Sequence, residues 1–128
     1  MKIEHVGLNV KDPVKLAEWY VRNLGMKVVR KLGAPAHTHF LADETGQVMI
    51  EIYNNTKAPV PDYASMDLLV LHLAFLSDDV DSDYKRLLEA GAGQLQAPYS
   101  IDTGDRIAVV RDPWGLAVQL VKRAKPMI

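Results

Sequence analysis

The two halves of this chain repeat one arrangement of strands, a helix and polar residues, and this repeat limits the fold more than any other feature. In the first half, His5 stands in the run IEHVGLNV and Glu51 in VMIEIY. In the second half, His72 stands in LVLHLAF and Gln119 in GLAVQLV, at nearly the same separation. Repeated units stack because one unit alone cannot bury its apolar face. The sequence therefore predicts two similar modules.

The first half has the pattern strand, helix and three strands. Residues 3–10 alternate apolar and polar side chains, which is typical of a strand. Asp12 followed by Pro13 predicts a helix start, with Asp12 as N-cap, and Gly25 predicts the helix end. The remaining strands are expected at residues 27–32, 37–42 and 47–53. A tight turn is expected at residues 44–46, before the last of these strands.

The second half restarts the same pattern after residues 54–67, which lack periodicity and contain Pro59 and Pro61. Ser77 or Asp78 is the expected cap of the second helix, and Gly91 its expected end. The strands are expected at residues 69–76, 94–95, 99–103, 106–111 and 116–122, with a turn at residues 112–115.

These elements predict an α+β fold in which a mostly antiparallel sheet is cupped around a shared cleft. The expected organisation is a single domain over residues 1–128. It contains two βαβββ modules, at residues 1–56 and 67–124, and a linker at residues 57–66.

Strand alternation places the four repeated polar residues on one face. Residues two apart in a strand share a face, so the apolar neighbours of His5, Glu51, His72 and Gln119 point to the opposite side, where the helices pack. A divalent ion needs about four nitrogen or oxygen donors. These four residues are therefore the predicted metal ligands, and the alternative for Gln119 is a hydrogen bond that holds a neighbouring ligand.

The same alternation assigns the other polar and aromatic residues to one face of the sheet or the other. Met49 and Tyr53 share the face of Glu51, and strand pairing puts Thr38 and Phe40 beside it. His37 and His39 then fall on the other face and are not predicted ligands. Pairing in the last hairpin is expected to put residue 108 beside Gln119, and so to place Arg106 on the ligand face. The substrate contacts predicted on this face are Asn9, Phe40, Met49, Tyr53 and Arg106.

Composition excludes several classes of protein. The chain has no cysteine, which rules out disulfides, thiolate metal sites and cysteine nucleophiles. The 15 basic and 16 acidic residues leave a net charge of −1 and form no basic stripe, so neither nucleic acid nor an anionic membrane is an expected partner. No signal peptide and no apolar run of about 20 residues is present. A cytoplasmic location is expected.

Four segments carry a resemblance to a known family. They are IEHVGLNVKDPVKLAEWYVRNLGMKVV, MIEIYNN, LHLAFLSDDVDSDYKRLLEAGA and VRDPWGLAVQLV. With them the chain resembles the vicinal oxygen chelate superfamily, and within it the small bacterial glyoxalase I type. That resemblance implies metal ligands at His5, Glu51, His72 and Gln119, although the last position is usually Glu. Asn9 stands where glutathione-using members often carry Arg. Asn55 matches a residue that helps to hold glutathione, so the resemblance adds Asn55 to the predicted substrate contacts.

The resemblance also implies a function. It implies a metal-dependent lyase or isomerase, lactoylglutathione lyase-like or epimerase-like, that acts on a small carbonyl substrate such as a thiohemiacetal or an acyl-thioester through an enolate intermediate. Glu51 is then the expected base, because Gln119 cannot accept the proton. Nickel, zinc, cobalt, manganese or iron(II) suits these donors. A homodimer is expected, in which the site lies within one chain or is shared between the two chains.

Two other classes stay open. One is an extradiol-type dioxygenase, and the other is a non-catalytic ligand-binding protein of the bleomycin-resistance type. The first needs two histidines and one carboxylate on iron(II). The second needs no metal ligands.

Overall fold

The computed structural model describes residues 1–127, which divide into two compact units between Pro61 and Asp62. Each unit has one helix and one four-stranded mixed sheet within the described residues. The expected α+β fold with two βαβββ modules is thus confirmed, and the break falls inside the predicted linker. No helix among residues 1–127 is long and apolar enough to cross a membrane.

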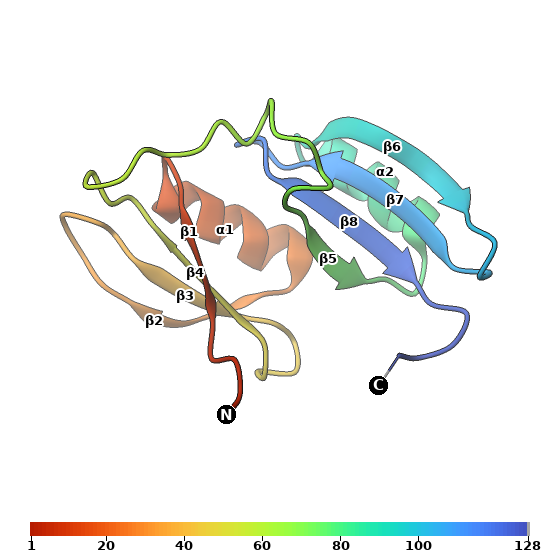
Figure 1. Cartoon of the computed structure of the whole chain (residues 1–128), viewed down its shortest axis with the longest axis horizontal. Coiled ribbons are helices and arrows are strands. Elements are labelled where there is room, and N and C mark those ends of the chain that lie inside the picture. Colours follow the sequence, from red (N-terminus) through yellow and green to blue (C-terminus); the bar gives the residue numbers. More distant parts are fainter. Residues whose placement is uncertain (128) are drawn as a thin grey trace. The chain divides into compact units, whose positions relative to one another are not determined.

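The first module contains α1, which covers one face of its sheet (Figure 1). The elements are β1 (Val6–Asn9), α1 (Pro13–Leu24), β2 (Lys27–Lys31), β3 (His39–Ala42) and β4 (Met49–Tyr53). Their order across the sheet is β1-β4-β3-β2, with β1 parallel to β4 and the other pairs antiparallel. The first strand is shorter than expected and begins after His5.

Local signals set the ends of α1 as predicted. The Asp12 carboxylate accepts a hydrogen bond from the backbone N–H of Lys15 at 3.1 Å, and Pro13 occupies the first turn. Gly25 ends the helix in the left-handed conformation at φ 69°. Leu16 and Tyr20 are fully buried on the helix face that meets the sheet, and each contributes roughly 1.5–3 kcal/mol of hydrophobic stabilisation.

The second module repeats this topology. Its elements are β5 (Leu73–Leu76), α2 (Val80–Glu89), β6 (Gly93–Ser100), β7 (Arg106–Arg111) and β8 (Ala117–Lys122), ordered β5-β8-β7-β6. Again the first strand pairs in parallel with the last, and the other pairs are antiparallel. The repeat read from the sequence is therefore a structural repeat.

Two predicted boundaries in this module were wrong. The strand expected at residues 69–76 begins only at Leu73, because Asp67 holds the preceding residues in a turn: its carbonyl accepts from Val70 N–H and its carboxylate from Leu69 N–H. The N-cap of α2 is Asp79, not Ser77 or Asp78, and its side chain accepts from the N–H of Ser82.

The strands expected at residues 94–95 and 99–103 form one strand, β6. Its pairing with β7 is irregular between Gln94 and Gln96 and again between Gln96 and Tyr99. Pro98 suggests a break in the sequence. An edge strand tolerates it because one row of its backbone groups needs no partner.

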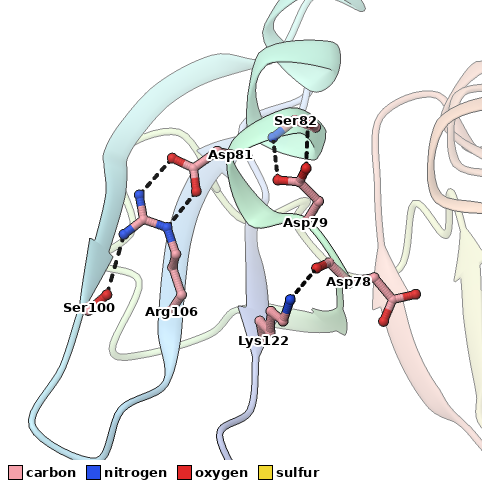
Figure 2. A network of polar contacts seen from close by, with 7 residues as sticks. All are labelled: Asp78, Asp79, Asp81, Ser82, Ser100, Arg106 and Lys122. Carbon is pink, nitrogen blue, oxygen red and sulfur yellow. Dashed lines mark hydrogen bonds and ion pairs between the residues drawn. The ribbon is translucent and has the colours of Figure 1, made fainter.

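The last hairpin corrects the placement of Arg106. Its loop holds five residues rather than four, so Gln119 pairs with Val109 and not with residue 108. Arg106 pairs with Lys122 instead and binds Asp81 on α2 through Nε and Nη2, at 2.5 and 2.6 Å (Figure 2). Arg106 therefore faces the helix, and the reason for assigning it to the substrate site is removed.

Candidate functional site

Glu51 lies in the middle of the first sheet, on the face away from α1. It pairs with Gly7 of β1 on one side and Phe40 of β3 on the other, as the sequence predicted for Phe40. A Cβ at Gly7 would lie 3.3 Å from Glu51 Oε2 and 3.4 Å from the hydroxyl of Tyr53. The carboxylate and the phenol therefore lie together over a stretch of backbone that carries no side chain.

His5 precedes β1 and turns its ring toward the same place. Its Nε2 lies 3.3 Å from Glu51 Oε2, and its Nδ1 contacts the carboxylate of Glu4. The ring packs edge-on against Phe40, with centroids 5.5 Å apart and an interplanar angle of 86°. The hydrogen bond with Glu4 raises the pKa of His5 above 6.5, desolvation opposes this, and the charges of Glu4 and Glu51 add to it.

The pair formed by His5 and Glu51 fits a divalent metal. With Nδ1 committed to Glu4, the lone pair of Nε2 faces a carboxylate oxygen, and two such acceptors need a proton or a metal ion between them. Their 3.3 Å separation is close to the spacing of neighbouring donors around an ion with bonds of about 2.0–2.2 Å. Glu4 then fixes the ring orientation, as carboxylates beside metal-binding histidines commonly do.

The second module presents the equivalent pair, His72 and Gln119. Ala74 pairs with Gln119 as Gly7 pairs with Glu51, and each histidine stands two residues before the small residue. The Nδ1 of His72 lies 2.9 Å from the carbonyl of Leu68. When Nδ1–H donates this hydrogen bond, Nε2 carries the lone pair that can bind a metal. That all four residues bind one ion stays a prediction, and residues 1–127 contain no cluster of three or more His, Asp or Glu side chains arranged for a metal.

The two asparagines predicted as substrate contacts, Asn9 and Asn55, form hydrogen bonds within the chain. The side-chain amide of Asn9 donates to the carbonyls of Asn55 and Ala58 at 3.1 and 3.0 Å, and its oxygen accepts from the N–H of Asn55 at 2.8 Å. The side chain of Asn55 accepts from the N–H of Lys57. The hydrogen bonds of Asn9 thus hold the loop after β4. An arginine at position 9 would instead carry a positive charge.

The remaining sequence assignments follow from strand register. Met49 and Tyr53 alternate with buried Ile50 and Ile52, so they share the face of Glu51 as predicted. His39 pairs with Ile52 and is 8% exposed on the helix side, which confirms that it is no partner of Glu51.

Sequence reasoning missed Glu4, Gly7 and the carbonyl of Leu68. Strict alternation puts Glu4 opposite His5, but regular β-structure starts only at Val6, so neighbouring side chains can meet. Gly7 carried a usable signal, because a glycine inside a strand often marks a close approach by another group.

Comparison with known proteins identifies the family of this chain. The family model described as Glyoxalase/Bleomycin resistance protein/Dioxygenase superfamily matches residues 2–120. The chain belongs to this superfamily. A superfamily relative, a probable lactoylglutathione lyase of Vibrio cholerae serotype O1, is 29% identical over 127 residues, which are 94% of this chain and 90% of that protein.

Two solved structures share the fold of this chain. Glyoxalase I from Zea mays is 25% identical with a TM-score of 0.77, over 97% of this chain and 45% of the maize chain. TnmS3, an antibiotic binding protein from Streptomyces sp. CB03234, is 21% identical with a TM-score of 0.74, over 97% of each chain. The second likeness concerns the fold alone.

Proposed function

We propose that this protein is a metal-dependent lyase or isomerase of the glyoxalase I type, acting on a small carbonyl substrate. The observation that carries the proposal is the approach of His5 Nε2 to Glu51 Oε2 over Gly7, beside Phe40 and Tyr53. The similarity to a probable lactoylglutathione lyase supports the same chemistry. His5, Glu51, His72 and Gln119 are the proposed ligands, within one chain or across a homodimer.

A bound divalent ion would supply a Lewis acid that polarises the substrate carbonyl. Glu51 is the proposed base: it accepts the proton from the carbon that carries the sulfur and the hydroxyl group and returns it to the neighbouring carbonyl carbon, while the hydroxyl proton passes to the former carbonyl oxygen. This transfer conserves all atoms and needs no external oxidant. His5, held by Glu4, keeps its orientation while Glu51 moves the proton.

The neutral Gln119 and the hydrogen-bonded Asn9 are the two departures of this chain from the glutathione-using members that it resembles. Gln119 contributes an amide oxygen and no negative charge, so Glu51 is the carboxylate of the proposed ligand set. Asn9 uses its amide on the loop at residues 55–59. We therefore do not propose that Asn9 binds glutathione.

The first test is metal content and turnover. The purified protein should retain or take up one divalent ion per proposed site, and it should convert the hemithioacetal of methylglyoxal with glutathione or a simpler thiol. Substituting Glu51→Gln should lower kcat about 10²–10⁴-fold without changing thermal unfolding, because a general base contributes that much. Glu18→Gln, at an exposed carboxylate on α1, is the matched control.

Three results would contradict the proposed role of Glu51 or favour a different function. Full activity in Glu51→Gln rejects Glu51 as the base. Cleavage of catechols under oxygen with iron(II), without hemithioacetal turnover, favours a dioxygenase. A protein that takes up no metal and binds an antibiotic in its place favours a binding protein.

A further inference from the structure

Strand register places four residues in one row across the first sheet. Glu51 pairs with Gly7 on one side and with Phe40 on the other, and Phe40 pairs with Arg30 of β2, the edge strand (Figure 1). Side chains at directly paired positions share a face of the sheet. Arg30 therefore belongs by register to the face that carries Glu51, with Phe40 between them, and as an edge-strand residue it also borders the hollow beside α1.

An irregularity in β2 produces this placement. Val28 pairs with Leu41, and Arg30 pairs with the next residue, Phe40, so that Val29 has no opposite partner. Without that extra residue Arg30 would turn to the helix side. The following residue, Lys31, pairs with His39 and lies on the helix side.

The charge of Arg30 is uncompensated among the described residues. Arg30 is exposed, and no carboxylate in residues 1–127 forms an ion pair with it. In contrast, Arg86, Arg106 and Arg123 each bind an aspartate. A guanidinium without an internal partner offers a planar set of donors for a carboxylate or phosphate.

The spacing fits one small molecule. Neighbouring strands lie about 4.8 Å apart, so the Cα atoms of Arg30 and Glu51 are roughly 10 Å apart, and both side chains extend from the same face. The ring of Phe40 lies between them and already contacts His5. We propose that Arg30 binds an anionic oxygen group, a carboxylate or a phosphate, of a substrate whose carbonyl lies at His5 and Glu51. This inference rests on the proposed function and adds a substrate class to it.

The test is a binding measurement that needs no turnover. Nuclear magnetic resonance titrations of ¹⁵N-labelled full chain with zinc use two matched pairs of probes. The first pair is 4-oxopentanoate and its methyl ester, and the second is dihydroxyacetone phosphate and dihydroxyacetone. Each member of a pair has the same carbonyl, and only one carries the anionic group. The variants are Arg30→Met, which keeps much of the apolar length, and Lys31→Met, the same change on the other face.

At least one anionic probe should bind more tightly than its neutral partner and shift the amides of residues 30 and 40. Arg30→Met should weaken that binding about tenfold, as expected for a charge-assisted contact, and leave the neutral probe unchanged. Lys31→Met should have no effect. Which pair responds identifies carboxylate or phosphate as the anionic group.

Equal binding of charged and neutral probes overturns the inference, as does unchanged binding by Arg30→Met. An equal loss in Lys31→Met also overturns it, because both residues border the hollow between α1 and β2 and the anion would then bind there. Anion binding through Arg30 in a protein that does not convert the hemithioacetal rejects the proposed lyase activity and keeps the assignment of Arg30.

Discussion

Substituting Gly7→Ala tests the candidate site with the smallest possible change. The new Cβ would lie 3.3 Å from Glu51 Oε2 and 3.4 Å from both Cε1 and the hydroxyl of Tyr53, so these groups must move by a few tenths of an ångström. Metal sites tolerate donor displacements of about 0.2 Å. Mutating the groups that orient a metal ligand typically costs 10–100-fold in affinity, and a displaced Glu51 is expected to cost a similar factor. We therefore expect zinc affinity to fall by at least about tenfold.

The fold should not suffer from the same change. Glycine inside a strand is less stable than alanine by roughly 0.5–1 kcal/mol, and this gain offsets the crowding at Glu51. The thermal midpoint should therefore move by less than about 4 °C. Isothermal titration with zinc and a thermal melt measure the two quantities on the same preparation.

The repeat supplies the control. Ala74 is the counterpart of Gly7, paired with Gln119. Ala74→Gly removes a Cβ and displaces no donor, so it should lower stability slightly and leave zinc affinity unchanged. If Gly7→Ala binds zinc as tightly as the wild type, Glu51 is not a metal ligand in the arrangement described.

Three further predictions concern the scaffold. Asn9→Ala should speed amide hydrogen exchange at residues 55–59, because the loop loses its side-chain clasp; unchanged exchange would contradict this. Gly115→Ala should cost about 1–3 kcal/mol in a denaturant melt, since φ is 95° and the Cβ would lie 2.6 Å from the backbone nitrogen of Ala64. The hydrogen bond with Arg106 lowers the pKa of Asp81 below 3.8, so this pair stabilises the fold above that pH and the effect is lost as pH falls through the lowered pKa. The difference in Tm between wild type and Arg106→Met should accordingly close in acid, and a constant difference would refute the ion pair's role.

Local chemistry explains which elements the sequence predicted well. Asp12, Pro13 and Gly25 act within one turn of the helix ends, so α1 was correct at both boundaries. Alternation placed Phe40 beside Glu51 because the β3–β4 hairpin is regular. Neither prediction depends on a distant part of the chain.

Errors arose where one residue changes the register. The last hairpin has a loop of five residues, and counting four shifted every pair by one and moved Arg106 to the wrong face. The row that contains Arg30 was not predicted for the same reason. A pattern of alternating residues does not reveal the extra residue Val29 in β2. Strand faces can be read from sequence only where no bulge or loop adds a residue.

The two modules share a scaffold but differ in charge along equivalent rows. In the first module the row across the sheet is Gly7, Glu51, Phe40 and Arg30, and in the second it is Ala74, Gln119, Val109 and Gln96. The first row carries a carboxylate and a guanidinium, whereas the second is neutral throughout. Because a neutral amide is no base for a proton on carbon and carries no positive charge, proton transfer and charge recognition in the proposed reaction are assigned to the first row. In the proposed ligand set, the second module supplies an imidazole and an amide oxygen but no carboxylate.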